Sequence, residues 1–122
     1  MRRSARFAMA CLAAGLFAGC TLVPTQVREA NRRTDVASSN PPAAAIHCVA
    51  RKAQEGRSGM VASSVRPMAG REHYEMAIWR LESTVAVIES APAASGSTLT
   101  VWLHPKVLDS AAADLMERVT SC

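Results

Sequence analysis

The 122-residue chain lacks the motifs that mark common catalytic and ligand-binding sites. It contains no Gly-rich phosphate-binding loop, and the serines of 95–97 have no strand–turn–helix context of the kind that activates a nucleophile. Its three histidines, His47, His73 and His104, do not occur at the spacing of zinc ligands. The sequence therefore predicts neither an enzyme nor a protein that holds a metal ion or another cofactor.

Most of the chain also lacks an excess of charge of one sign. The full sequence has 14 basic and 10 acidic side chains, but three of the arginines precede residue 7, in an N-terminal segment that we expect to be removed. The remaining 11 basic and 10 acidic side chains nearly balance, so nucleic acid is not predicted as a partner. A local cluster of Arg28, Arg32 and Arg33 either lies in a solvated linker or contacts anionic head groups or glycans.

An apolar segment of the usual membrane-spanning length is missing. A helix needs about 20 apolar residues to cross a bilayer, whereas the longest apolar segment, 7–23, has 17 and includes a threonine and two cysteines. It follows a basic start and runs into the small residues Ala18 and Gly19. That order is typical of a secretory signal peptide, and it predicts an exported protein.

The end of this segment resembles the lipidation signal of bacterial lipoproteins. Leu16-Phe17-Ala18-Gly19-Cys20 has the small residue and the glycine that precede the acylated cysteine in that family, although Phe17 holds the position where leucine is usual. The resemblance covers Met1 to Cys20. It implies that 1–19 is a signal peptide, that Cys20 is acylated, and that the protein is anchored in a lipid bilayer of the bacterial envelope.

The residue after the cysteine bears on the membrane that is chosen. In such lipoproteins an aspartate there favours retention in the inner membrane, and this chain has Thr21. The resemblance therefore implies the outer membrane, with the folded part facing the periplasm. Three alternatives stay open: an ordinary signal peptide cut near Ala18, which gives a soluble periplasmic protein, an uncleaved membrane anchor, and a buried helix.

The four cysteines suggest one disulfide bond. Cys11 lies within the signal peptide and Cys20 is the expected acylation site, which leaves Cys48 and Cys122. Because an exported chain enters an oxidising compartment, we expect these two to pair. The bond would close a loop of about 75 residues, for which loss of chain entropy predicts about 4.5 kcal/mol of stabilisation. Two unpaired buried cysteines are the alternative.

The exported chain divides into a tether and one small domain. Residues 20–40 are polar and show no sustained periodicity, so we expect the lipidated cysteine to be followed by a flexible tether. The folded domain is predicted over 41–122. It opens with a helix that Asn40 caps and that ends near Gly56, although a strand over 46–50 is the alternative.

The rest of the domain is predicted to contain extended segments and a second helix. The segments are 60–68, 72–81, 85–89 and 98–104, of which 72–81 and 98–104 alternate apolar and polar residues. The final helix follows Pro105, and its apolar stripe consists of Leu108, Ala112, Leu115, Val119 and Cys122. Together these predict an α+β fold, with an antiparallel sheet of about four strands in the order α-β-β-β-β-α and both helices on one face.

The opposite face of the sheet is the predicted interaction surface. Strand alternation places two tryptophans among polar residues there, and exposed tryptophan is common at interaction sites. The alternative is that the tryptophans shield the sheet edge or fill gaps under a loop. The residues expected on this face are Trp79, Trp102, His73, Glu75, Thr98, Thr100 and His104.

The functional prediction is a non-catalytic interaction or structural module that binds an envelope protein or peptidoglycan. A soluble periplasmic accessory protein, or a binder of a small apolar ligand, is the alternative. Such a ligand would need a cavity between the sheet and the helices, and the small residues Ala45, Ala50 and Ala53 of the first helix favour close packing instead.

Overall fold

The computed structural model describes Arg28 and residues 32–56, 59–107 and 109–122. The predicted signal peptide, Cys20 and half of the predicted tether lie outside these residues. The elements in chain order are β1 (Arg32–Ser38), α3 (Pro42–Glu55), β2 (Val61–Ala62), β3 (Arg66–Pro67), β4 (Tyr74–Arg80), β5 (Ser83–Ala93), β6 (Gly96–Leu103) and α4 (Asp109–Thr120).

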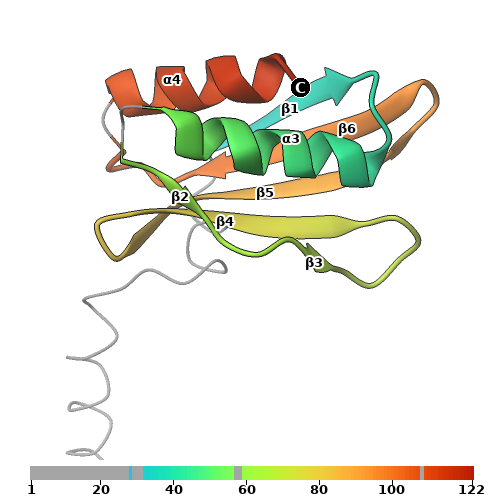
Figure 1. Cartoon of the computed structure of the whole chain (residues 1–122), viewed down its shortest axis with the longest axis horizontal. Coiled ribbons are helices and arrows are strands. Elements are labelled where there is room, and N and C mark those ends of the chain that lie inside the picture. Colours follow the sequence, from blue (N-terminus) through green and yellow to red (C-terminus); the bar gives the residue numbers. More distant parts are fainter. Residues whose placement is uncertain (1–27, 29–31, 57–58, 108) are drawn as a thin grey trace, which may run out of the picture.

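The fold is α+β, with one antiparallel sheet and two helices. The strand order is β1-β6-β5-β4-β2, and β3 pairs with β4 beside β2. Both helices lie next to each other on the same face of the sheet (Figure 1). The sheet has six strands where the sequence predicted about four. The difference arises because β1 was not predicted and because the extended segment 60–68 forms two separate strands of two residues each.

Strand β1 corrects the predicted boundary between tether and domain. The tether was expected to reach residue 40, but 32–38 pairs along its whole length with β6, from Arg32 opposite Leu103 to Ser38 opposite Ser97. Most side chains of this edge strand are exposed. Backbone hydrogen bonds hold it in place, and a strand without apolar alternation leaves no periodic signal in the sequence.

Two tight turns connect the three long strands. Leu81 and Glu82 link β4 to β5 with φ angles of 51° and 67°. The predicted loop 92–97 is shorter in the structure, because β5 continues to Ala93 and β6 begins at Gly96. Gly96 has a φ of 142°, and a Cβ atom there would lie 2.1 Å from the backbone oxygen of Ser38, so no other residue fits where the end of β1 meets the beginning of β6.

The core lies between the sheet and the helices. The predicted alternation of 72–81 and 98–104 is confirmed, since the helix-facing side chains of these strands are almost fully buried. The first helix is also confirmed, and the strand alternative for 46–50 is wrong. The largest fully buried side chains of the core include Ile46, Val49, Met76, Ile78, Ile88, Leu99, Val101, Leu115 and Val119.

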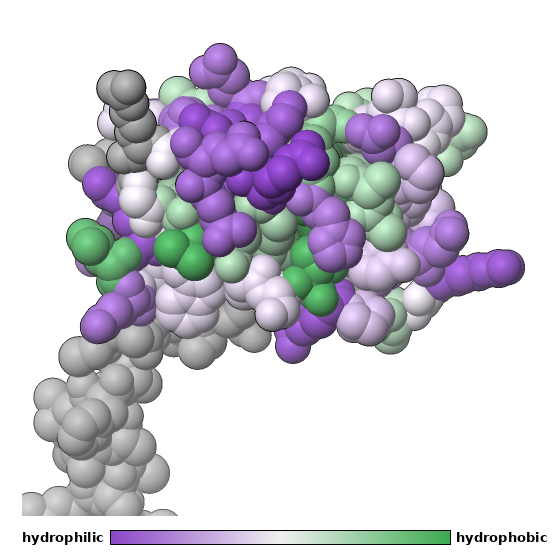
Figure 2. Space-filling view, in the orientation of Figure 1, coloured by the Kyte–Doolittle hydropathy of each residue, from purple (hydrophilic) through white to green (hydrophobic). Residues whose placement is uncertain are grey.

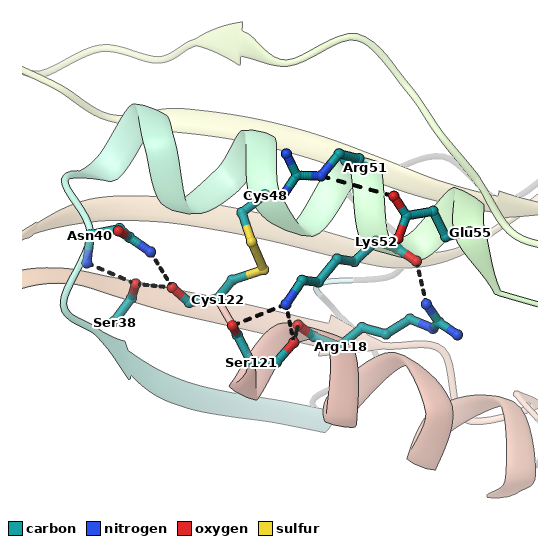
Figure 3. The surroundings of a disulfide bond; sticks show 9 residues. All are labelled: Ser38, Asn40, Cys48, Arg51, Lys52, Glu55, Arg118, Ser121 and Cys122. Carbon is teal, nitrogen blue, oxygen red and sulfur yellow. Dashed lines mark hydrogen bonds and ion pairs between the residues drawn. A yellow bond between two sulfur atoms is a disulfide. The ribbon is translucent and has the colours of Figure 1, made fainter.

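A disulfide bond joins the two helices. Cys48 of α3 bonds to Cys122, which follows α4, across a Cα–Cα distance of 5.8 Å and a sequence separation of 74 (Figure 3). Lys52 reinforces this contact, because its Nζ donates hydrogen bonds to the backbone oxygen (3.1 Å) and hydroxyl (2.8 Å) of Ser121. The pairing predicted from the cysteine count is therefore present.

Hydrogen bonds from the β1–α3 connection also hold Cys122. The backbone oxygen of Cys122 accepts from the hydroxyl of Ser38 and from the side-chain amide of Asn40, both at 2.6 Å (Figure 3). Asn40 is therefore not the helix cap that the sequence predicted. The residue before α3 is Pro41, which makes no side-chain cap hydrogen bond. Within the described residues, no helix has the length and hydropathy needed to span a membrane.

Candidate functional site: the outer face of the sheet

The outer face is the side of the sheet that points away from α3 and α4. Because side chains alternate along a strand, the neighbours of the buried core residues point to this side. Its residues come from the four strands β1, β6, β5 and β4, together with Arg66 of the short strand β3. They are Arg33, Asp35, Thr98, Thr100, Trp102, Val87, Glu89, Glu75, Ala77 and Trp79.

The strand register aligns most of these residues in two rows across the sheet. One row is entirely polar and consists of Asp35, Thr100, Glu89, Glu75 and Arg66. Glu75 and Glu89 are directly opposite each other in this row. Like charges in directly opposed positions destabilise a sheet. The outer face therefore needs a cation close to both carboxylates.

Arg28 supplies this cation from a distant part of the chain. Its Nη2 donates to Oε2 of Glu75 and, at 2.5 Å, to Oε1 of Glu89. The other oxygen of Glu75 accepts from Nε of Arg66 at 2.6 Å and from its Nη2. The Glu75 side chain is only 4% exposed, and a buried carboxylate needs such partners because its desolvation is otherwise very unfavourable.

The second row places Trp102 beside Arg33. The guanidinium carbons of Arg28 and Arg33 lie 5.3 Å and 5.6 Å from the centroid of the indole ring, within the range of cation–π contacts. Arg33 also pairs with Asp35 at 3.3 Å. A hydrogen bond from Thr100, followed by the contacts with Arg33, holds the pKa of Asp35 below its ordinary value. Trp102 is therefore fixed within a charged network.

Trp79 lines an open groove over β4. The groove has a volume of about 520 Å³, and Ser64, Arg66 and Glu75 also line it. Its far wall is the connection between β2 and β3. This wall is held to β4 because Ser63 donates its backbone N–H to the Ala77 oxygen, and the Ser63 hydroxyl oxygen accepts from the Ala77 N–H, both at 2.8 Å. The groove combines an indole ring, serine hydroxyls and a guanidinium group that is 68% exposed.

The outer face contains some of the residues predicted for it and not others. Trp79, Trp102, Glu75 and Thr98 belong to it as expected. Thr100 also belongs to it, but it is only 9% exposed and hydrogen bonds to Asp35, so it supports the surface more than it forms it.

The two predicted histidines lie outside the strands. His73 precedes β4 in the turn that contains Gly70. His104 follows β6, where its Nδ1 accepts from the backbone N–H of Lys106 at 3.1 Å, and it lines a different hollow beside α4. The prediction that His104 joins Trp102 on the outer face is wrong, because the regular alternation of β6 ends at Leu103 and the His104 side chain lies at the hollow beside α4.

The residues that organise the outer face were not all predicted. Arg28 was assigned to a solvated linker or a contact with head groups, and neither Glu89 nor Arg66 was assigned to the site. The sequence contained one signal for such a network. Glu75 is a charged residue within an alternating strand, and its carboxylate requires a cation. The sequence does not say which arginine supplies that cation, because the partners lie 47 and 9 residues away.

Comparison with known proteins assigns no function to the outer face. No protein family model, no curated protein and no solved structure matches the chain. Among the described residues, no group of three histidine, cysteine, aspartate or glutamate side chains could hold a metal ion. The outer face offers side chains for stacking, hydrogen-bonding and ionic contacts.

Proposed function

We propose that this protein is a non-catalytic interaction module, lipid-anchored in the bacterial envelope through Cys20, and that it binds an envelope protein or peptidoglycan through the outer face. The observation that carries the binding proposal is the groove beside Trp79. Tryptophan and arginine are the residue types most enriched at energetically important contacts. Trp79 and Arg66 lie together in this groove on a sheet held by its own hydrogen bonds.

Preorganisation supports this assignment. Arg66 is 68% exposed, yet its guanidinium is oriented by the buried carboxylate of Glu75. A partner would therefore meet a side chain whose conformational entropy is already reduced, which favours binding. The helix side offers less, since hydrophilic residues cover the helices and the hydrophobic residues form only separate spots (Figure 2).

The contact of Arg28 also bears on the anchor. If Cys20 carries the lipid, eight residue steps separate it from Arg28, and a fully extended chain of that length spans roughly 28 Å. Arg28 lies on the outer face. The groove would then be held near the membrane surface, and its partner must be accessible there. This excludes partners restricted to the centre of a wide periplasm.

Photocrosslinking from the groove tests the interaction. A photoreactive residue replaces Ser64, which is exposed and lines the groove, and a matched probe replaces His47, which is exposed on α3. We expect a discrete covalent adduct in envelope fractions from position 64 and none from position 47. The adduct should decrease at least 10-fold in Trp79→Ala and Arg66→Ala, and persist in Arg51→Ala, which alters a solvent-exposed pair on α3.

Two outcomes contradict the proposal. An adduct from position 47 alone would assign binding to the helices. No adduct from either position, with the protein present in the envelope fraction, would leave a purely structural role. Thermal unfolding of each variant separates loss of the partner from loss of the fold.

A further inference from the structure

A second hollow lies away from the outer face, at one end of the sheet. The β4–β5 turn, the segment after β6 and the beginning of α4 meet there (Figure 1). The hollow has a volume of about 230 Å³, and most of its wall is apolar. Met60, Leu115 and Ala111 form buried parts of this wall, and Val85 and Val107 are half-buried. It is a gap between the sheet and α4 that the first helix does not reach.

Leu81 stands beside this hollow in an unfavourable position. It is 85% exposed, and its φ of 51° lies in the left-handed region. Glycine, asparagine and aspartate are the usual residues in a two-residue turn with positive φ, and a bulky residue there is strained. A leucine at this position therefore has both an exposed side chain and a strained backbone. Covering its side chain with apolar surface would remove the first of these penalties.

The mouth of the hollow is cationic. Lys106 lines it and is exposed, Arg80 lines it within an interaction of its own, and no described lining residue is acidic. The first turn of α4, which contributes Ala111 to the wall, has the partial positive charge of a helix N-terminus and also contains Asp109, so Lys106 is the main source of positive charge at the mouth. Glu82 and Asp109 are the acidic residues nearest in the chain, and neither lines the hollow. An anionic group at the mouth would therefore be attracted.

We propose that this hollow binds a single-chain amphipathic anion, such as a fatty-acid carboxylate. The alkyl chain occupies the gap against Met60 and Leu115, Leu81 packs over the chain, and the head group lies at Lys106. The volume is sufficient, because an apolar cavity of about 150 Å³ already accommodates benzene. This site is independent of the outer face and of lipidation at Cys20.

A free amphiphile fits this site better than the surface of a bilayer. Docking on a bilayer requires a contiguous exposed apolar patch. Among the described residues, only Val61 and Leu81 are exposed large hydrophobic residues, and Val61 is in β2, opposite Trp79 of β4. Leu81 and the hollow beside it fit a single alkyl chain, not the surface of a bilayer.

NMR titration of the mature chain tests the proposal, with residues 20–122 and Cys20→Ser so that the protein stays soluble. The ligands are hexanoate, octanoate and decanoate, all below their micelle-forming concentrations, and the cationic control is decyltrimethylammonium. We expect shifts at Met60, Leu81 and Leu115. Each added methylene that enters the hollow should tighten binding about 4-fold, and the cation should bind at least 10-fold more weakly than decanoate.

Three variants with matched controls locate the site. Ala111→Phe fills the hollow and should abolish binding, whereas Ala113→Phe, at an exposed position of α4, should not. Lys106→Glu should weaken decanoate at least 10-fold, and Arg71→Glu, exposed in a distant turn, should have little effect. Leu81→Asn should weaken binding while raising the unfolding temperature, because asparagine tolerates positive φ. Its predicted gain in stability distinguishes lost binding from unfolding.

The proposal is overturned if the cation binds as tightly as decanoate, if both phenylalanine variants behave alike, or if the shifts map to Trp79 and Trp102. It is also overturned if the protein cosediments with anionic phospholipid vesicles but does not respond to monomeric decanoate. None of these results depends on whether the outer face binds a partner.

Discussion

At the scale of single residues, the contact between Arg28 and Glu75 determines how the outer face is built. The register places Glu75 opposite Glu89, and Arg28 is the cation shared by both carboxylates. Removing one partner of a buried ion pair is far more destabilising than removing an exposed one, because it leaves a charge without compensation. Arg28, although it comes from a polar segment, therefore supports the fold.

Replacing Arg28 with alanine should lower the free energy of unfolding by about 2–3 kcal/mol, somewhat less than for a pair left without any partner because Arg66 still contacts Glu75. The double variant Arg28→Ala/Glu89→Gln should recover part of this loss, since it also removes the repulsion. Urea denaturation of the two single variants and the double variant measures the coupling. A loss below 0.5 kcal/mol, within the usual range of a surface substitution, would mean that Arg28 is not held on the sheet.

Asp35 makes a pH-dependent contribution to the stability of the fold, and the sign of this contribution follows from its lowered pKa. Its pKa lies below the ordinary value of 3.8, mainly because of the hydrogen bond from Thr100. The resulting stabilisation is present above the pKa of the unfolded chain and is lost as the pH falls through the lower pKa of the folded protein. Thr100→Val should move this pKa up towards 3.8, as followed by NMR of the carboxyl carbon. An unchanged pKa in this variant would assign the shift to Arg33 instead.

Thr84 is a buried polar residue whose substitution should stabilise the fold. It is fully buried, and its hydroxyl oxygen has no hydrogen-bond partner within the described part of the chain. An unpaired buried hydroxyl is unfavourable, and valine has nearly the same shape. Thr84→Val should therefore raise the free energy of unfolding by about 1 kcal/mol in chemical denaturation. A decrease would show that the hydroxyl has a partner in the folded protein.

At the scale of elements, the sequence predicted those whose apolar residues repeat. The first helix, β4, β6 and the final helix each have a periodic row of apolar residues that packs in the core, and this periodicity was sufficient to find them. Strand β1 could not be found in this way. Its burial is nearly uniform and low, and its pairing depends on the backbone of β6, which is 59 or more residues away in the chain.

The close approach of Gly96 to the end of β1 can be tested with substitutions at two glycines, Gly96 and Gly59. Gly96→Ala places a Cβ atom against the backbone oxygen of Ser38, and it also strains a backbone with a φ of 142°. We expect a loss of at least 3 kcal/mol, since backbone must move. Gly59 also has a positive φ, of 68°, but a Cβ atom there would meet nothing within 4 Å. Gly59→Ala should therefore lower the free energy of unfolding by only about 1 kcal/mol, and equal losses would show that the close approach is absent.

At the scale of the whole molecule, covalent and polar links connect the ends of the described domain. The disulfide joins α3 to the residue that follows α4, and Ser38 and Asn40 bind the same cysteine from the end of β1. The pairing was predictable because only two cysteines remain once Cys11 is assigned to the expected signal peptide and Cys20 to the expected acylation site. The hydrogen bonds to Cys122 were not, because they depend on where β1 ends.

Removing the disulfide with Cys48→Ala and Cys122→Ala should lower the free energy of unfolding by about 4.5 kcal/mol, as expected from the chain entropy of a loop of this length. Chemical denaturation of the oxidised protein and of the double variant measures the difference. A loss below about 1 kcal/mol would show that the helices are held mainly by the core.

The most direct test of the proposed anchoring is the intact mass of the protein extracted from membranes, measured with and without reduction. The account predicts a chain that begins at Cys20, carries an acylated glyceryl group, and gains a pair of hydrogen atoms when Cys48–Cys122 is reduced. An unmodified polypeptide that begins near Ala18 or at Met1 would contradict it. The binding proposal for the outer face would then have to apply to a soluble or membrane-spanning protein.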